Sequence, residues 1–364
     1  MDGGSVITRI LLVLSCILAV LVCYLYVDIW FYVQAQPPVA SIAAPSVVAD
    51  QTVPLFPDLG FQSVVKVKGI YTYEDMVDNL GALLKQYPLL SADIIGRSVE
   101  GRAIYLLKLG HGPQKILVDA THHANEWIGS FLMMTMVEHY AYYYHTGQMF
   151  DQYDLRQLCE QVTFYFVPMV NPDGVDIVAN AGKNSQDYAQ LVSYNGGSHD
   201  FSGWKANAHG VDLNRQYPTN WSLAEGYGPS SPAPANYAGP HPLSEPEIVA
   251  MDALHRSEGF SAQISFHTVG NAVYYFYHQT GAELSRDRAL AQAVSIATGY
   301  QLRHSSGGIG GLERDYVVST YKIPSLIVEL GRNKRRPLLE YGDIWQRNRH
   351  VPLLVADHLL NLGP

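Results

Sequence analysis

The sequence has little cysteine and little charge, and both shortages restrict what the protein can be. Of its 364 residues only three are cysteines, Cys16, Cys23 and Cys159, and the first two lie in an apolar N-terminal run. The rest of the chain has one thiol, so it can form neither an intramolecular disulfide nor a cysteine-based zinc site. Charged residues make up 16% of the chain and the net charge is −9, with no basic stripe. We therefore expect no nucleic-acid partner.

The remaining composition is that of a globular protein with a large core. Hydrophobic residues make up 48% of the chain, and the length allows one large domain or two smaller ones. There is no internal repeat. Residues 34–62 are rich in proline and alanine and are typical of an extended linker. A short basic run, Arg332 with Lys334, Arg335 and Arg336, indicates a solvated loop.

Positive charge is absent around the apolar N-terminal run, except at its start. The run covers residues 10–33, is interrupted only by Asp28, follows Arg9, and is followed by no lysine or arginine until Lys66. It is long enough to span a bilayer, and the positive-inside bias places the short N-terminus in the cytoplasm. A cleaved signal sequence, with cleavage near Val33-Gln34-Ala35, stays open as the alternative. In both cases the bulk of the chain is exported.

From about Val64 onward, apolar runs alternate with helical patterns, which predicts an α/β fold. Strands are expected over residues 103–109, 115–120, 162–167, 263–266 and 325–328. Helices are expected over residues 73–87, 128–144, 283–298 and 343–360. A capping box starting at Thr72 begins the first helix, and Pro352 is expected to break the last. The expected organisation is a cytoplasmic N-terminus (1–9), an anchor or signal sequence (10–33), a linker (34–62) and one domain (63–364).

A candidate metal site lies at the ends of these strands. His123 and Glu126 are three residues apart directly after an expected strand, and His267 ends another. A catalytic zinc takes three nitrogen or carboxylate donors and keeps one position open, and ligand sites of open α/β sheets lie at the carboxyl ends of strands. The His-x-x-Glu spacing also occurs by chance. His122 has Asn125 and no acid at the matching offset, so we interpret it as a supporting or structural residue.

Further motifs follow in a fixed order. They are Asn171-Pro-Asp-Gly174, Trp204-Lys-Ala-Asn207, Gly210-Val-Asp-Leu-Asn-Arg215, Pro242-Leu-Ser-Glu-Pro-Glu247 and Ile327-Val-Glu329. With these blocks the chain, from about Tyr71 to the C-terminus, resembles the zinc carboxypeptidase family. Within it the nearest match is to bacterial γ-D-glutamyl-diaminopimelate endopeptidases, which cut peptidoglycan stem peptides. The resemblance implies a mixed β-sheet flanked by helices.

The resemblance also implies a catalytic centre. One zinc ion per chain would be held by His123, Glu126 and His267, and Glu329 would be the general base. Zinc activates water and polarises a carbonyl group, and a nearby carboxylate can take the proton of the water and pass it to the leaving amine. The structural alternative for Glu329 is an ion pair with a nearby arginine.

Three residues match binding positions of the family. Lys205, directly after Trp204, matches a cation, usually arginine, that steadies the developing oxyanion. Lysine supplies this charge as a point, without the planar fork of arginine. Asn214 and Arg215 match the pair that holds a substrate carboxylate beside the scissile bond, which a guanidinium can bind bidentately. A surface arginine is the alternative for Arg215.

The chain departs from the family where a tyrosine should cover the bound substrate. Asp315 lies fourteen residues before Glu329, as the family pattern requires, but residues 305–311 upstream of it contain no tyrosine. The glycines there favour an open rim. Arg314 matches the base of the pocket for the residue after the scissile bond, where its charge would favour an acidic substrate side chain.

The substrate expected from the resemblance is a peptidoglycan stem peptide. Diaminopimelate carries two carboxylates, of which Arg215 would hold one and Arg314 the other. We expect a single-pass membrane protein with an extracytoplasmic catalytic domain, or a secreted one if the N-terminal segment is cleaved. Two alternatives stay open: an exopeptidase that removes acidic C-terminal residues from ordinary peptides, and a catalytically dead protein that binds wall peptides.

Overall fold

The structure is a computed structural model that describes residues 61–305 and 308–361. These residues form a mixed eight-stranded sheet in the order β1-β2-β4-β3-β5-β8-β6-β7. Strands β4, β3, β5 and β8 are parallel neighbours. On one side β2 runs antiparallel to β4 and β1 antiparallel to β2, and on the other side β6 runs antiparallel to β8. The strands are β1 (Ser91–Arg97), β2 (Ala103–Gly110), β3 (Gln114–Ala120), β4 (Val162–Val167), β5 (Ala262–Thr268), β6 (Ala272–Tyr274), β7 (Gln301–Arg303) and β8 (Ser325–Leu330).

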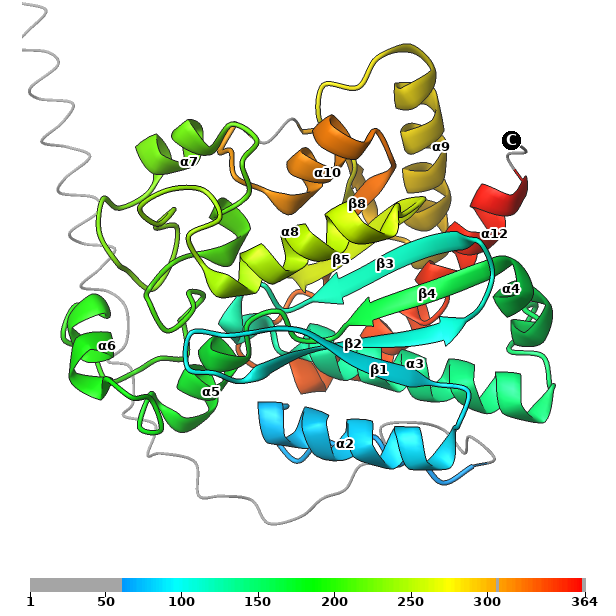
Figure 1. Ribbon diagram of the computed structural model, residues 1–364, viewed down its shortest axis with the longest axis horizontal. Helices are drawn as coiled ribbons and strands as arrows, with labels where there is room; N and C mark the ends of the chain where they lie inside the picture. Colours follow the sequence, from blue (N-terminus) through cyan, green and yellow to red (C-terminus); the bar gives the residue numbers. More distant parts are fainter. Residues whose placement is uncertain (1–60, 306–307, 362–364) are drawn as a thin grey trace, which may run out of the picture. The chain divides into compact units, whose positions relative to one another are not determined.

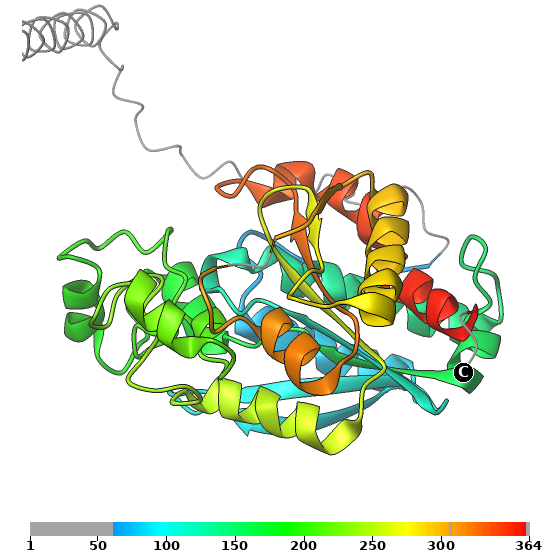
Figure 2. The same cartoon turned by 90° about the horizontal axis from the view of Figure 1, so that it is seen from above.

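Helices cover both faces of this sheet (Figures 1 and 2). One core contains side chains of α2, α3, α4, α9, α11 and α12, and a second core contains side chains of α8 and α10. The helices are α2 (Tyr73–Gln86), α3 (Ile128–Thr146), α4 (Leu155–Gln161), α5 (Pro172–Asn180), α6 (Tyr188–Tyr194), α7 (Trp221–Tyr227), α8 (Pro246–Glu258), α9 (Gly281–Thr298), α10 (Glu313–Tyr321), α11 (Tyr341–Asn348) and α12 (Val351–Asn361), with short 3₁₀ turns η1 (Ala124–Glu126), η2 (Leu213–Arg215) and η3 (Pro337–Glu340).

The central strands form because their sequences are apolar on both sides. Every residue of β4 and β5 is buried, as is the second half of β3. A strand covered on both faces has no solvent side, so it needs no exposed polar residue at every second position. The polar residues that β5 does contain are buried, and Gln263 and Ser265 donate hydrogen bonds to Asp119 of β3. The five strands expected from apolar runs are confirmed, with bounds that differ by a few residues at most.

The expected helix signals are also confirmed. The hydroxyl of Thr72 accepts the N–H of Asp75, and the Asp75 carboxylate accepts the N–H of Thr72, both at 3.1 Å. The break expected near Pro352 separates α11 from α12, and Pro352 is the second residue of α12, where its missing N–H costs no helical hydrogen bond.

The expected anchor over residues 10–33 and nearly all of the linker over residues 34–62 lie outside the described residues. Within residues 61–305 and 308–361, no helix combines the length and the apolar character needed to cross a membrane.

Candidate functional site

Three neighbouring parallel strands deliver the candidate catalytic residues to one edge of the sheet. His123 and Glu126 follow β3, His267 lies in β5, and Glu329 lies in β8. The register pairs Ala120 with Phe266 across β3 and β5, and His267 with Glu329 across β5 and β8. The carboxyl ends of these strands therefore bring together residues that are distant in the sequence, as open α/β sheets do at their ligand sites.

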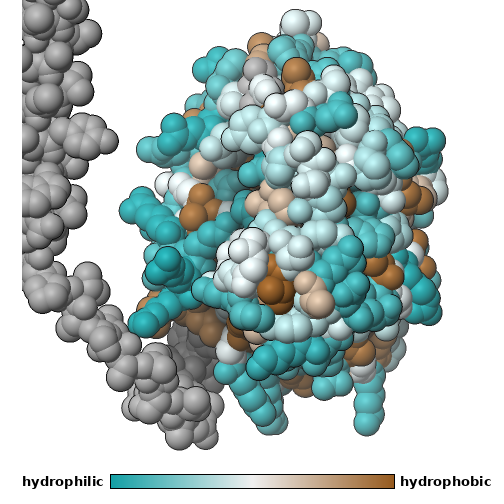
Figure 3. Space-filling view, turned by 90° about the vertical axis from the view of Figure 1, so that its left-hand side faces the viewer, coloured by the Kyte–Doolittle hydropathy of each residue, from teal (hydrophilic) through white to brown (hydrophobic). Residues whose placement is uncertain are grey.

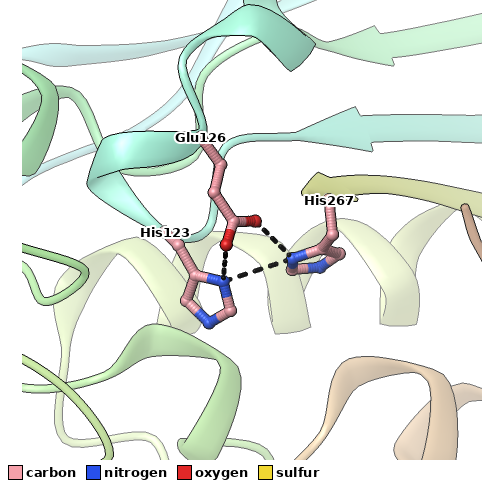
Figure 4. A group of neighbouring side chains, drawn as sticks. All are labelled: His123, Glu126 and His267. Atoms are coloured by element: carbon pink, nitrogen blue, oxygen red, sulfur yellow. Dashed lines mark hydrogen bonds and ion pairs between the residues drawn. The ribbon is translucent and has the colours of Figure 1, made fainter. Parts of the chain in front are cut away.

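The three expected zinc ligands point at one another (Figure 4). Nδ1 of His123 lies 3.0 Å from Oε1 of Glu126, and Nδ1 of His267 lies 3.1 Å from Oε2. The two Nδ1 atoms are 3.3 Å apart. All three side chains are buried. This convergence is the geometric condition on which the interpretation of the sequence depends, and the structure meets it.

The donor set fits a zinc ion. One donor atom from each residue lies within 4.8 Å of the other two, and Oε1 of Glu126 is a buried oxygen that accepts no hydrogen bond among the described residues. Two imidazole nitrogens that face each other repel unless a proton or a cation lies between them. A cation between two nitrogens and a carboxylate oxygen removes both problems, and this ligand set is one that catalytic zinc uses.

The charges of the candidate ligands already favour a cation. Burial by itself would raise the pKa of Glu126, but His123 and His267 hold it well below its usual range, so the carboxylate is ionised. Burial, opposed by Glu126, lowers the pKa of His267, which favours the neutral imidazole. Burial also acts to lower the pKa of His123, but Glu126 and Asp212 outweigh it and raise this pKa. Because a metal ion binds ionised carboxylates and neutral imidazoles, its binding would displace any proton that His123 holds.

Asp212 supports His123 from behind. Its Oδ1 lies 3.2 Å from Nε2 of His123, the ring nitrogen opposite the one that faces Glu126. The carboxylate is fully buried, and it also accepts the N–H groups of Asn214 and Asn236. Such a carboxylate fixes the tautomer and the ring orientation of a ligating histidine. Asp212 lies inside the Gly-Val-Asp-Leu-Asn-Arg block, but it was not among the site residues predicted from the sequence.

Glu329 lies beside the candidate ligands without joining them. Burial and the nearby charge of Glu126 raise the pKa of Glu329 to about 8. Its Oε2 has no hydrogen-bond partner among the described residues. The alternative for Glu329, an ion pair with Arg332 or Arg314, is not among the ion pairs of the described residues. A half-buried carboxylate with a buried free oxygen and a raised pKa has the properties of a general base or acid.

Two lysines reach the same oxygen of Glu126. Nζ of Lys205, the expected oxyanion group, lies 3.4 Å from Oε1 of Glu126, and Nζ of Lys334 lies 3.6 Å from it. Lys205 therefore lies beside the candidate metal ligands, and its role toward an oxyanion stays a prediction. Lys334 was missed, because the basic run that contains it is typical of a solvated loop. Its position five residues after Glu329 is the one signal that the sequence offers.

Asn214 and Arg215 belong to η2 on the rim of the site. Nη1 of Arg215 donates to the carbonyl of Asn214 at 2.7 Å, and Nη2 donates to the side-chain oxygen of Asn236 at 3.1 Å. Its Nε is buried without a hydrogen-bond partner among the described residues. Gly311 packs against this turn, and a Cβ there would overlap the carbonyl of Arg215. Glycine is needed at this position because the backbones pack closely and because its φ is positive, at 66°.

Arg314 is more enclosed than Arg215, the other arginine expected to bind substrate. It is 2% exposed, and its Nε and Nη2 donate to Oδ1 of Asp315 at 2.8 and 2.5 Å. Burial raises the pKa of Asp315, and Arg314 opposes this rise. To hold a substrate carboxylate, Arg314 would have to share this ion pair. Arg215 is therefore better placed than Arg314 to bind a substrate carboxylate, because its Nε has no hydrogen-bond partner among the described residues.

A second cluster of potential ligands lies behind the first. It consists of Asp119, His122 and Glu313, all buried. Both oxygens of Asp119 already accept hydrogen bonds, from Gln263 at 2.6 Å and Ser265 at 2.5 Å. His122 lies 2.9 Å from the Tyr217 hydroxyl, and its ring stacks on that of His267 at 5.7 Å. We assign zinc to the first group and a supporting role to this cluster, which matches the interpretation of His122 from the sequence.

Comparisons with known proteins agree with this geometry. A family model described as zinc carboxypeptidase matches residues 76–327. The chain is 34% identical over 278 residues to γ-D-glutamyl-L-diamino acid endopeptidase 1 of Lysinibacillus sphaericus. The aligned region covers 76% of this chain and 69% of that protein.

Solved structures show the same fold at low identity. Bovine thrombin-activatable fibrinolysis inhibitor, in complex with tick carboxypeptidase inhibitor, superimposes with a TM-score of 0.63 at 20% identity, over 80% of this chain and 97% of that one. A metallo-carboxypeptidase from Burkholderia cenocepacia gives a TM-score of 0.53 at 20% identity, over 80% and 70% of the two chains.

Proposed function

The chain belongs to the zinc carboxypeptidase family, and we propose that it hydrolyses the γ-D-glutamyl-meso-diaminopimelate bond of peptidoglycan stem peptides. As a member it is a zinc metallopeptidase. The observation that carries the finer proposal is its 34% identity to the Lysinibacillus endopeptidase, which extends over most of both chains. The face toward which β3 and β4 run is a mixture of hydrophilic and intermediate residues with scattered hydrophobic ones (Figure 3).

The catalytic groups have separate tasks in this proposal. Zinc, held by His123, Glu126 and His267, supplies a Lewis acid that polarises the scissile carbonyl and makes water acidic. Glu329 takes the proton of the attacking water and passes it to the leaving nitrogen. The ammonium group of Lys205 faces the negative charge that develops on the carbonyl oxygen.

Substrate carboxylates are the natural partners of the two arginines. Arg215, whose Nε lacks a partner, would bind the α-carboxylate of a terminal diaminopimelate. Arg314 would bind the second carboxylate by sharing its ion pair with Asp315. On this proposal Arg314→Ala lowers kcat/KM for a diaminopimelate peptide far more than for its amidated analogue. Equal losses on both peptides would remove Arg314 from the substrate site.

The cellular location is part of the proposal, because a wall peptide is outside the cytoplasm. The apolar run over residues 10–33 would hold the protein in the membrane with its catalytic domain outside. N-terminal sequencing of the protein from washed membranes tests this. The intact N-terminus supports an anchor, and a start near residue 36 indicates a cleaved signal sequence.

The substrate is tested with the purified stem tripeptide L-Ala-γ-D-Glu-mDAP and with the tetrapeptide that ends in D-Ala. Mass spectrometry of the products is expected to show free diaminopimelate from the tripeptide and the dipeptide mDAP-D-Ala from the tetrapeptide. Chelator should abolish both products, and zinc should restore them. The matched control is Glu329→Gln, which keeps the metal ligands and the shape of the site.

Each other outcome identifies a different protein. Release of D-Ala alone from the tetrapeptide indicates an exopeptidase. Cleavage of ordinary peptides at acidic C-terminal residues, with intact stem peptides left over, also supports the exopeptidase. Binding of stem peptides without any product, in a preparation that contains zinc, supports the dead binding protein.

A further inference from the structure

The side chain of Lys334 points in a different direction from those of the neighbouring basic residues. Arg335 and Arg336 are exposed, whereas the side chain of Lys334 is about one-third exposed and points to the candidate metal centre. The loop that carries it joins β8 to η3. A lysine that turns inward while its neighbours face solvent has a specific partner.

The backbone of this loop is held in place. The Glu340 carboxylate accepts the N–H groups of Arg332 at 2.7 Å and Asn333 at 3.0 Å, and the Asn333 side chain accepts the N–H of Arg336 at 2.9 Å. Hydrogen bonds on both sides of Lys334 fix the point from which its side chain extends. Its reach toward the site is therefore a property of the loop.

The acidic partner of Lys334 in the structure is Glu126, which would be occupied by the zinc ion once the metal is bound. Nζ of Lys334 and Nζ of Lys205 lie 3.6 and 3.4 Å from the same oxygen, Oε1 of Glu126. That carboxylate belongs to the zinc ion in the working enzyme. Among the ion pairs of residues 61–305 and 308–361, Lys334 has no other acidic partner. The ammonium group of Lys205 can face the developing oxyanion, which leaves the ammonium group of Lys334 for another anion.

Arg314 and the loop of Lys334 lead to helices on opposite faces of the sheet. Arg314 belongs to α10, which packs in the core with α8, whereas the Lys334 loop leads to α11, which packs in the core with α3 (Figure 2). If the arginines hold the diaminopimelate carboxylates on the leaving side, then Lys334 lies toward the acyl side of the scissile bond.

The proposed substrate has a carboxylate on the acyl side. A γ-linked glutamyl residue is cut at its side-chain carbonyl, so its α-carboxylate stays free, four carbon–carbon bonds or roughly 5 Å from the scissile carbon. An α-linked peptide carries a carboxylate at this distance only when the residue before the scissile bond is itself a glutamate. A lysine provides a mobile point charge that suits a single carboxylate.

We propose that Lys334 binds the free α-carboxylate of the γ-linked D-glutamyl residue and so selects this residue over its α-amide, D-isoglutamine. This inference rests on the proposed function. Because a hydrogen bond to a charged partner is worth about 1.5–3 kcal/mol, the selection should be about 10- to 100-fold. The selection should appear mainly in KM, since the carboxylate does not take part in bond breaking.

The experiment compares two tripeptides that differ at one group, L-Ala-γ-D-Glu-mDAP and L-Ala-γ-D-isoGln-mDAP, with the zinc-loaded full chain. The wild type should prefer the first about 10- to 100-fold in kcat/KM. Lys334→Met should abolish the preference by raising KM for the first peptide alone, and Lys334→Arg should restore part of it. Arg335→Gln, a neighbouring cation that faces solvent, is the matched control and should keep the preference.

A second readout avoids turnover. Zinc-loaded Glu329→Gln should bind the acid tripeptide more tightly than the amide by a similar factor in calorimetry, and adding Lys334→Met should remove the difference. If the wild type cuts γ-D-glutamyl peptides but Lys334→Met keeps the preference, or loses activity on both peptides equally, the role of Lys334 is wrong and the proposed function stands. If no γ-D-glutamyl peptide is cut, both fail.

Discussion

His267 and Glu329 are direct neighbours on adjacent parallel strands, paired residue to residue although they lie far apart in the sequence. One is a proposed zinc ligand and the other is the proposed general base. Their spacing is therefore set by the hydrogen-bonded sheet, which is the most rigid part of the fold. A base placed on a strand keeps its distance from the metal centre better than one on a loop.

Replacing Glu329 separates its role from that of the ligands. Glu329→Gln should lower kcat by about 10²–10⁴-fold, because an amide of the same shape cannot take a proton from water. Zinc content should stay at one ion per chain. Peptide hydrolysis and elemental analysis on the same preparation check both statements. Near-normal turnover would assign the base to another group.

Removal of zinc should lower the thermal stability of the protein. A ligand that binds only the folded chain adds about 2.7 kcal/mol when its free concentration is 100 times Kd. The melting temperature should rise as zinc is added back to chelated protein. His267→Ala should abolish this response, whereas His111→Ala, an exposed histidine outside the site, should keep it. A zinc-dependent shift in His267→Ala would place the ion elsewhere.

Asp212 should matter for metal affinity more than for folding. Asp212→Asn keeps one oxygen, which can accept the N–H of Asn214 or of Asn236, and it loses the charge that supports His123. The loss of such a carboxylate typically costs 10–100-fold in metal affinity. Competition with a chelating dye measures this change, and the melting temperature of the zinc-free variant serves as the control. Unchanged affinity would mean that Asp212 serves only the backbone turn.

His139, which lies in α3 away from the site, should make the protein sensitive to acid. Burial lowers the pKa of His139 from 6.5 to about 4. Between these values the unfolded chain binds a proton that the folded chain does not bind, so stability is lost as the pH falls from 6.5 toward 4. A single such group contributes at most about 1.4 kcal/mol per pH unit.

The matching variant is His139→Asn, whose amide can still donate to the carbonyl of Thr135, the present partner of Nδ1 at 2.7 Å. Urea unfolding at pH 7 and pH 5 should show a smaller loss of stability for the variant than for the wild type. Equal losses in both proteins would exclude His139 as the source.

The sequence predicted the centre of the fold and the metal ligands from different signals. Strands such as β4 were predicted because they are apolar runs, whereas His123 and His267 were predicted from their places at strand ends together with the ordered motifs of the family. The edges of the sheet lack such apolar runs. Strands β6 and β7 have three residues each, too few for any period, and β1 is largely accessible along its length.

The supporting residues could not be predicted because their roles depend on tertiary contacts. Asp212 looks like any turn aspartate until His123 is packed against it. Lys334 looks like its exposed neighbours until the loop after β8 is fixed by Glu340. The partner of Arg314 is the adjacent Asp315, yet nothing in that dipeptide shows that both side chains are buried together.

The position of β5 between β3 and β8 has a consequence for how the enzyme is assembled. The first two ligands are synthesised long before the third, and His267 cannot meet them until β5 has inserted beside β3. A nascent chain or a fragment that stops earlier offers only His123 and Glu126, a pair that holds zinc far less tightly than three ligands do. Binding by all three proposed ligands therefore requires β5 to be paired with β3.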